Sequence, residues 1–275
     1  MTFGARLHET IAARGRLCVG IDPHPGLLAD WGCADDAGGL ERFALGAVEA
    51  LAPEVAVVKP QSAFFERHGS AGVAVLERVV AACRERGALV LLDVKRGDIG
   101  STSQAYADAY LDPSSPLAAD AVTVSPFLGV GALDPFFETA DRHRAGVFVL
   151  ALTSNPEGAD VQRARTGTGT VAGAVLAGVR QRNAGAEPWG SHGVVVGATV
   201  RGAEEDLDVH GPVLAPGFGA QGGTVEDLRR LFGPVAPQVL PTSSRDVLRH
   251  GPDPRALRAA ARRLNEEVAV LGASA

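Results

Sequence analysis

Lysine is scarce in this chain, and its two lysines stand where chemistry could occur. Of 26 cationic Lys and Arg residues only Lys59 and Lys95 are lysines, and arginine supplies the rest. A guanidinium stays protonated in proteins, whereas an ammonium group can give up its proton. Chance survival of two lysines in an arginine-rich composition is the simpler alternative. The scarcity nevertheless singles out Lys59 and Lys95 as candidates for proton transfer.

Carboxylates accompany both lysines. Asp93 and Lys95 are two residues apart at the end of an apolar run, and on an extended segment such side chains point to the same side. We expect Asp22, Lys59 and Asp98 to converge on the same place. Alternating Lys and Asp in a confined site shift one another's pKa, as active sites require. A solvated salt bridge explains one such pair, but the whole cluster favours a catalytic centre.

A second group of residues is suited to binding an anion. The segment Gly217–Gly223 contains four glycines, so its backbone N–H groups can approach an anion closely, and Gln221 adds an amide donor. The later segment Thr242–Ser244 predicts a helix N-cap, with Arg245 in the first turn. A cation there opposes the helix dipole unless an anion is bound. A plain flexible turn is the alternative for the glycine loop; together, the two segments predict a phosphate site.

The elements that must position these residues follow a strand–helix repeat. Short Val, Leu and Ile runs alternate with amphipathic segments, as expected of parallel strands buried on both faces. Eight such repeats predict one (β/α)8 TIM barrel over residues 1–275, with functional residues at the carboxyl ends of the strands. A doubly wound open sheet is the alternative, although no Gly-x-Gly-x-x-Gly follows the first strand. The expected strands are Leu17–Ile21, Val55–Val58, Leu89–Asp93, Ala121–Val124, Val147–Leu152, Gly193–Gly197, Val213–Ala215 and Gln238–Leu240. The expected helices are Gly39–Leu51, Ala71–Arg86, Ser101–Leu111, Leu133–Arg144, Val161–Asn183, Thr224–Phe232 and Asp253–Leu271.

Composition narrows the classes of partner. The net charge is −6, and no basic stripe with interleaved aromatic residues is present, which argues against nucleic acid as a partner. Cys18, Cys33 and Cys83 have no metal-site spacing and indicate a reducing compartment. The chain has neither an apolar signal-peptide core at its start nor an apolar run long enough for a membrane span. We therefore expect a cytoplasmic protein with no membrane partner and no metal site.

These motifs, in this order, resemble the orotidine 5′-phosphate decarboxylases, and specifically their longer bacterial subgroup, type 2. The signature of that family is Asp-x-Lys-x-x-Asp, which here is Asp93, Lys95 and Asp98. The resemblance extends over nearly the whole chain. The segments that carry it are Val19–Pro23, Val58–Ser62, Leu92–Ile99, Leu152–Pro156, Ala215–Gly223 and Ser244–Arg245.

The resemblance implies an activity, the decarboxylation of orotidine 5′-phosphate to uridine 5′-phosphate (UMP) in pyrimidine biosynthesis, without a metal or organic cofactor. It implies that Lys95 protonates C6 of the pyrimidine as carbon dioxide departs. Asp93 would lie beside the substrate carboxylate and hold Lys95. Lys59 and Asp22 would contact the ribose.

The same resemblance implies the remaining binding residues and a homodimer with shared sites. Asp98 would reach the neighbouring subunit's site, with Ile99 and Thr102 close by. Ser154 would read the pyrimidine edge, and the glycine loop would close over the phosphate. The other implied substrate-binding residues are Ile99, Thr102, Gln221, Gly222, Ser244 and Arg245.

Two other functions remain possible from the sequence. Related barrels with a similar Asp-x-Lys-x-x-Asp motif are magnesium-dependent sugar-phosphate lyases or synthases, such as the hexulose-phosphate synthases. Those enzymes need a further carboxylate ligand near the end of strand two, and here the nearest is Glu66, some way beyond Lys59. A catalytically silent barrel that only binds a phosphate ligand is the other alternative, which the intact Asp93, Lys95 and Asp98 disfavour.

Overall fold

Eight parallel strands close into a barrel in the computed structural model, which describes residues 1–167 and 169–272. Around the barrel the strands follow the order β1-β10-β9-β8-β5-β4-β3-β2. The predicted TIM barrel is therefore confirmed, and the open sheet is excluded. The barrel strands are β1 (Cys18–Ile21), β2 (Val57–Pro60), β3 (Leu89–Arg96), β4 (Ala121–Val124), β5 (Gly146–Leu152), β8 (His192–Val196), β9 (Val213–Pro216) and β10 (Val239–Ser243).

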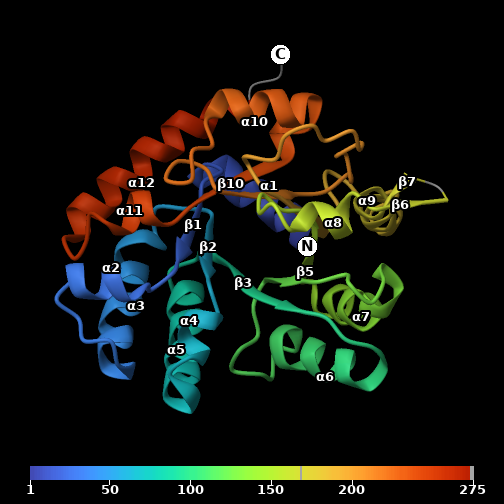
Figure 1. The fold of residues 1–275 in the computed structure, drawn as a ribbon. Coiled ribbons are helices and arrows are strands. Elements are labelled where there is room, and N and C mark those ends of the chain that lie inside the picture. The colour runs from blue at the N-terminus through green and yellow to red at the C-terminus, as the bar shows by residue number, and fades with distance from the viewer. Residues whose placement is uncertain (168, 273–275) are drawn as a thin grey trace.

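Helices surround the strands on the outside, as Figure 1 shows. One apolar cluster fills the layer between strands and helices, for example with Phe43, Leu76 and Phe136. The major helices are α3 (Ala37–Leu51), α5 (Gly69–Glu85), α6 (Gly100–Leu111), α7 (Asp134–His143), α9 (Val171–Arg182), α10 (Val225–Phe232) and α12 (Pro254–Val268). Shorter helical segments are α2 (Pro25–Asp30), α4 (Ala63–Glu66), α8 (Gly158–Gln162), α11 (Arg245–Leu248), η1 (Val130–Leu133), η2 (Gly233–Gln238) and η3 (Ala269–Leu271).

A separate apolar cluster fills the barrel itself. It contains inward side chains such as Leu91 and Phe148, together with Phe3 and Leu7 of helix α1 (Phe3–Arg14). The rings of Phe3 and Phe148 meet edge to face, with centroids 6.1 Å apart. Helix α1 therefore packs onto the amino-terminal end of the barrel interior, and the opposite end is left to the polar residues of the site.

Two expectations about local structure are wrong. The segment Val161–Asn183 was expected to be helical, with a polar approach over Gln162–Thr170. That approach is instead the end of α8 and a small antiparallel pair of strands, β6 (Arg165–Thr166) and β7 (Gly169–Thr170), and only α9 is the expected helix. The two strands project beside α9 (Figure 1). The stretch before α9 is polar and contains glycine, which explains why it does not continue the helix. Helix α9 begins after Thr170, whose hydroxyl caps the first turn by accepting from the Gly173 N–H.

The second correction concerns the end of β10. Thr242 and Ser243 were expected to form a helix N-cap, but they belong to the strand, where they pair with Cys18 and Val19 of β1. The rest of the expectation is confirmed in position, because Ser244 is the N-cap residue of α11 and Arg245 lies in its first turn, although the Ser244 side chain makes no capping hydrogen bond. Pairing with β1 keeps the chain extended as far as Ser243, beyond Leu240, where the expected strand ends.

No helix among the described residues combines the length and the hydropathy that crossing a bilayer requires.

Candidate active site

Strand alternation places polar side chains at the carboxyl end of the barrel. On β3, Leu89 and Leu91 point into the apolar interior, and Asp93 follows two residues later on the same face. On β2, Val57 occupies the interior and Lys59 follows in the same way. Asp93 and Lys59 therefore line the mouth of the barrel, each two positions after the last inward apolar residue of its strand.

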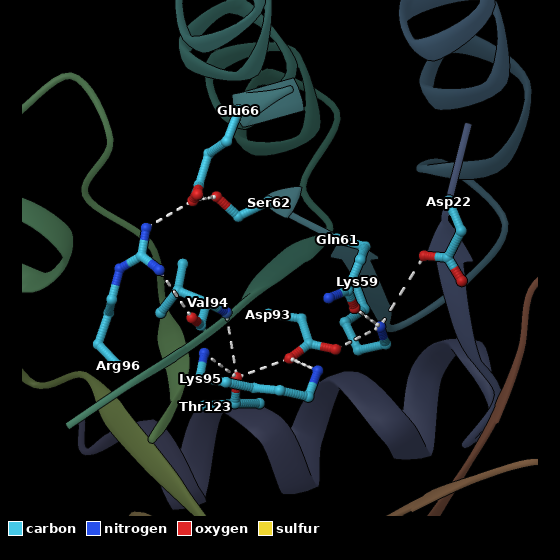
Figure 2. Close-up of polar contacts among 10 residues, drawn as sticks. All are labelled: Asp22, Lys59, Gln61, Ser62, Glu66, Asp93, Val94, Lys95, Arg96 and Thr123. Carbon is cyan, nitrogen blue, oxygen red and sulfur yellow. Dashed lines mark hydrogen bonds and ion pairs between the residues drawn. The ribbon is translucent and has the colours of Figure 1, made fainter. Parts of the chain in front are cut away.

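Asp93 is the centre of a charge cluster between the two lysines (Figure 2). Its Oδ2 accepts from Lys59 Nζ at 3.0 Å, and its Oδ1 accepts from Lys95 Nζ at 2.6 Å. The Thr123 hydroxyl donates to Oδ1 at 2.7 Å. Asp22 Oδ1 lies 4.0 Å from Lys59 Nζ. The predicted convergence of Asp22, Lys59, Asp93 and Lys95 is thus confirmed.

The cluster keeps its buried members charged. Burial by itself raises the pKa of Asp93, but the charges of Lys59 and Lys95 outweigh it and hold this pKa well below its usual range. Burial likewise lowers the pKa of Lys59, yet the charges of Asp93 and Asp22 raise it above its usual value. At neutral pH the site therefore contains a fixed carboxylate flanked by a buried ammonium group.

Lys95 reaches Asp93 by a route that simple alternation does not predict. Its backbone is left-handed, with φ +48°, and the pairing of β3 with β4 is irregular between Leu92 and Arg96. The expectation that Asp93 and Lys95 lie on a regular extended segment is therefore wrong, although their side chains do meet. The Lys95 side chain is half exposed at the mouth, so a bound molecule could reach it.

A cavity of about 250 Å³ adjoins this cluster at the ends of β9 and β10. Arg245 lies there with no ion-pair partner among the described residues, so its charge is free to bind an anion. The Ser244 hydroxyl is buried and lacks a hydrogen bond within the described chain. The cavity is lined by Asp22, His24, Lys59, Pro216, Gly217, Phe218, Ala220, Gln221, Thr242, Ser244 and Arg245.

The glycine loop differs in one respect from what its composition predicts. The N–H groups of Gly219, Gly222 and Gly223 donate to carbonyl groups within the loop itself. Positive φ angles at Gly217, Gly219 and Gly222 permit this fold. Three of the backbone donors expected to face an anion are therefore occupied, and the Gln221 side chain and Arg245 are the main candidates.

Other predicted site residues lie outside this cavity. Among the described residues Asp98 forms no ion pair or hydrogen bond with the charge cluster, and its Oδ1 accepts from the Ile99 N–H at 2.8 Å. Ile99 and Thr102 are exposed at the start of α6. Ser154 follows β5, packs beside Gly197 and lines a neighbouring cavity. Within one chain, the expected convergence of Asp98 with Lys59 and Asp93 is thus not observed.

Comparisons with known proteins agree with this geometry. The model of the "Orotidine 5′-phosphate decarboxylase / HUMPS family" matches residues 15–260. The chain belongs to this family. A Nocardioides relative named orotidine 5′-phosphate decarboxylase is 68% identical over 270 residues, covering 97% of this chain and 98% of the relative. The relative of the same name from Salinispora arenicola is 66% identical over 265 residues, covering 96% and 95%.

A solved structure shares the whole architecture. The crystal structure of a Streptomyces avermitilis protein assigned as an orotidine 5′-phosphate decarboxylase is 59% identical, with a TM-score of 0.96. The match covers 99% of this chain and 96% of that one. The fold of this chain is therefore the same as that of the solved structure over nearly its whole length.

The structure also reveals site residues that the sequence analysis missed. Thr123 contacts Asp93 and the backbone of β3, and His24 lines the cavity. Gln61 Oε1 accepts from Lys59 Nζ at 3.4 Å. For Thr123 a signal was present, because it is a lone hydroxyl in the otherwise apolar strand Ala121–Val124.

Glu66, the carboxylate considered as a metal ligand, is directed elsewhere. Its Oε1 accepts from Arg96 at 2.6 Å and from the Ser62 hydroxyl at 2.5 Å, away from Asp93 (Figure 2). The Arg96 guanidinium also lies over the Tyr106 ring, 5.6 Å from its centroid. Glu66 therefore does not supply the charge cluster with the further carboxylate that a magnesium-dependent member needs near the end of β2.

Proposed function

We propose that this protein converts orotidine 5′-phosphate to UMP and carbon dioxide, with Lys95 as the proton donor. The observation that carries the proposal is the Asp93 carboxylate, held between Lys59 and Lys95 at the barrel mouth. The names of relatives at 66–68% identity support the same reaction.

The phosphate occupies the cavity at the ends of β9 and β10. Arg245 and the Gln221 amide bind it, and Ser244 lies beside them, whereas Gly222 follows Gln221 in the loop and lines a neighbouring cavity. The unpaired charge of Arg245 supports this assignment. Binding of a remote phosphate supplies energy that orients the pyrimidine for reaction. Asp22 and Lys59 contact the ribose between the phosphate and the reacting ring, and Ser154 contacts the pyrimidine edge.

The chemistry requires a cation at the reacting carbon. The bond between C6 and the carboxylate breaks, carbon dioxide leaves, and the electron pair remains on C6. The Lys95 ammonium stabilises that charge and then transfers its proton to C6. Asp93 lies beside the departing carboxylate and keeps Lys95 in position. No metal or organic cofactor takes part.

Loss of absorbance of orotidine 5′-phosphate tests the reaction. The wild-type protein should turn over, and Lys95→Ala should abolish turnover while circular dichroism shows an intact fold. Lys95→Arg is the matched control, because it keeps the cation but gives up a proton far less readily. Full activity in Lys95→Ala would refute the assignment.

A chelator separates this reaction from the magnesium-dependent alternative. The pairing of Glu66 with Arg96 favours the decarboxylase, so EDTA should leave activity unchanged. Activity abolished by EDTA and restored by magnesium would favour a sugar-phosphate lyase or synthase. Phosphate-ligand binding without any turnover would indicate a silent barrel.

The active sites are shared in a homodimer. Ile99, Phe127 and Leu128 are 61%, 78% and 53% exposed in the single chain, and exposed apolar side chains of this size, where they form a patch, mark interaction surfaces. Asp98 and Thr102 stand beside Ile99 and reach the partner's site.

Mixing inactive subunits tests the shared site. Lys95→Ala and Asp98→Ala proteins should regain part of the activity when mixed, because each hybrid dimer contains one site with both residues intact. No recovery, once subunit exchange has been demonstrated, would contradict the shared site.

The location proposed is the cytoplasm. All three cysteines are free thiols, and burial raises the pKa of Cys18 and Cys83 to about 12. Free thiols fit a reducing compartment.

A further inference from the structure

Strands β3 and β4 are out of step beside the catalytic lysine. Leu92 pairs with Val122 and Arg96 pairs with Val124. Three residues of β3, namely Asp93 to Lys95, therefore lie opposite the single residue Thr123 of β4. An insertion of this kind is a β-bulge, which bends a strand and re-aims its side chains.

The Thr123 hydroxyl contacts all three residues of the bulge. Its oxygen accepts from Val94 N–H at 3.1 Å and from Lys95 N–H at 3.0 Å. Its proton is donated to Asp93 Oδ1 at 2.7 Å. A hydroxyl group has one donor and two acceptor positions, so every hydrogen-bonding position of Thr123 is used. The side chain is 1% exposed, so a water molecule could take the place of the hydroxyl only if a cavity opened there.

These contacts fix a backbone conformation that lysine does not prefer. At φ +48° the Lys95 backbone lies in the left-handed region, which a side chain with a Cβ disfavours. Such a conformation persists only where the surroundings impose it. Here the two amide hydrogen bonds to Thr123 hold Val94 and Lys95 in the bulge. The Lys95 side chain can then return to Asp93, with Nζ 2.6 Å from Oδ1.

We propose that Thr123 is a positioning residue for catalysis. One hydroxyl fixes the Lys95 backbone and orients the Asp93 carboxylate that receives the Lys95 ammonium group. Thr123 does not contact the substrate, and it acts through Asp93 and Lys95. The kinetic part of this proposal rests on the decarboxylase function proposed above, whereas the structural part does not.

Thr123→Val tests the proposal, because valine has nearly the same shape but lacks the hydroxyl. We expect kcat for orotidine 5′-phosphate to fall by about a hundredfold, since a misplacement of about 1 Å has effects of this size. The KM should stay close to wild type, because the phosphate cavity is not lined by Thr123. Thr123→Ser keeps the hydroxyl and should restore most of kcat. Wild-type kcat in Thr123→Val, or equal losses in Thr123→Val and Thr123→Ser, would overturn the proposal.

A matched control separates positioning from general stability. Thr139 is also fully buried, and its hydroxyl accepts from Gln104 Nε2 at 3.1 Å. Thr139 belongs to the outer helix α7 and makes no hydrogen bond to the charge cluster among those of the described residues. Thr139→Val should lower the melting temperature and leave kcat unchanged. An equal loss of kcat in Thr139→Val and Thr123→Val would show that only stability is involved, against the proposal.

The geometry can be tested without an activity assay. In a crystal structure of Thr123→Val, Lys95 should leave the left-handed region and its Nζ should move beyond hydrogen-bonding distance of Asp93. An unchanged bulge would overturn the proposal, even if the wild-type protein proves to have another activity. Should Thr123→Val fail to fold, Thr123→Cys replaces it, because a thiol is only a weak hydrogen-bonding group. Its kcat should lie well below that of Thr123→Ser, and equality of the two would count against the proposal.

Discussion

Lys59→Met removes the more deeply buried cation of the site at nearly constant side-chain volume. Lys59 and Asp93 are 4% and 6% exposed, and their charged atoms are 3.0 Å apart. Removing one partner of a buried pair costs about 3–5 kcal/mol, because the other charge stays buried without compensation. Asp93 retains Lys95 and Thr123, so the loss should be near the lower end, about 3 kcal/mol.

Calorimetric melting at pH 7 measures the effect. For a chain of this size each kcal/mol shifts the melting temperature by roughly 2–4 °C, so Lys59→Met should melt roughly 6–12 °C below wild type. Arg78→Met is the matched control, since it breaks an exposed ion pair with Glu41 of 2.8 Å. Exposed pairs contribute about 1 kcal/mol or less, so its shift should be no more than a few degrees.

A second substitution isolates the cause. If the uncompensated Asp93 charge is responsible, adding Asp93→Asn to Lys59→Met should raise the melting temperature again, because the buried charge is gone. A Lys59→Met shift no larger than that of Arg78→Met would refute the reasoning. So would a double variant that is less stable than Lys59→Met.

Two further predictions concern pH and the glycine loop. Folding lowers the pKa of Asp93, so the stabilising contribution of Asp93 is present above the ordinary pKa of 3.8 and is lost as pH falls through the folded pKa. Folding raises the pKa of Lys59, so the stabilising contribution of Lys59 is present below the ordinary pKa of 10.5 and is lost only as pH rises through the folded pKa. The difference in melting temperature between wild type and Lys59→Met should therefore be constant between these limits and shrink below pH 3.8, and a difference that changes steadily around neutrality would contradict this assignment. Gly219→Ala should raise the KM roughly tenfold, because φ is +78° and an added Cβ collides with the Asp246 carboxylate. Gly233→Ala is the control, because Gly233 has φ +46°, open space around it and a place outside the site; this variant should be less stable but keep the wild-type KM. Equal KM values in the two variants would contradict a role of the glycine loop in binding.

The sequence alone predicted the barrel and most of the charge cluster. Apolar runs of three to six residues, separated by amphipathic helices, give eight expected strands that all overlap observed ones. Six of them agree closely, and β4 (Ala121–Val124) agrees residue for residue, whereas β2 and β10 share only two residues each with the expected strands. Both lysines and Asp93 were found because polar residues at the ends of buried strands must lie at the mouth of the barrel. Local pattern was sufficient for these, since burial and strand alternation are written directly in the order of residue types.

Contacts between strands decided the rest. The sequence places Asp93 and Lys95 two apart, but it does not reveal the bulge, because a bulge is a mismatch between two strands and not a property of either one. The same holds for Thr242 and Ser243, which pairing with β1 keeps in the strand, and for the glycine loop, whose N–H groups bond within the loop. Thr123 shows the difference most clearly. In sequence it is one hydroxyl in an apolar strand, and only the register of β4 against β3 places it opposite three residues that include Asp93 and Lys95.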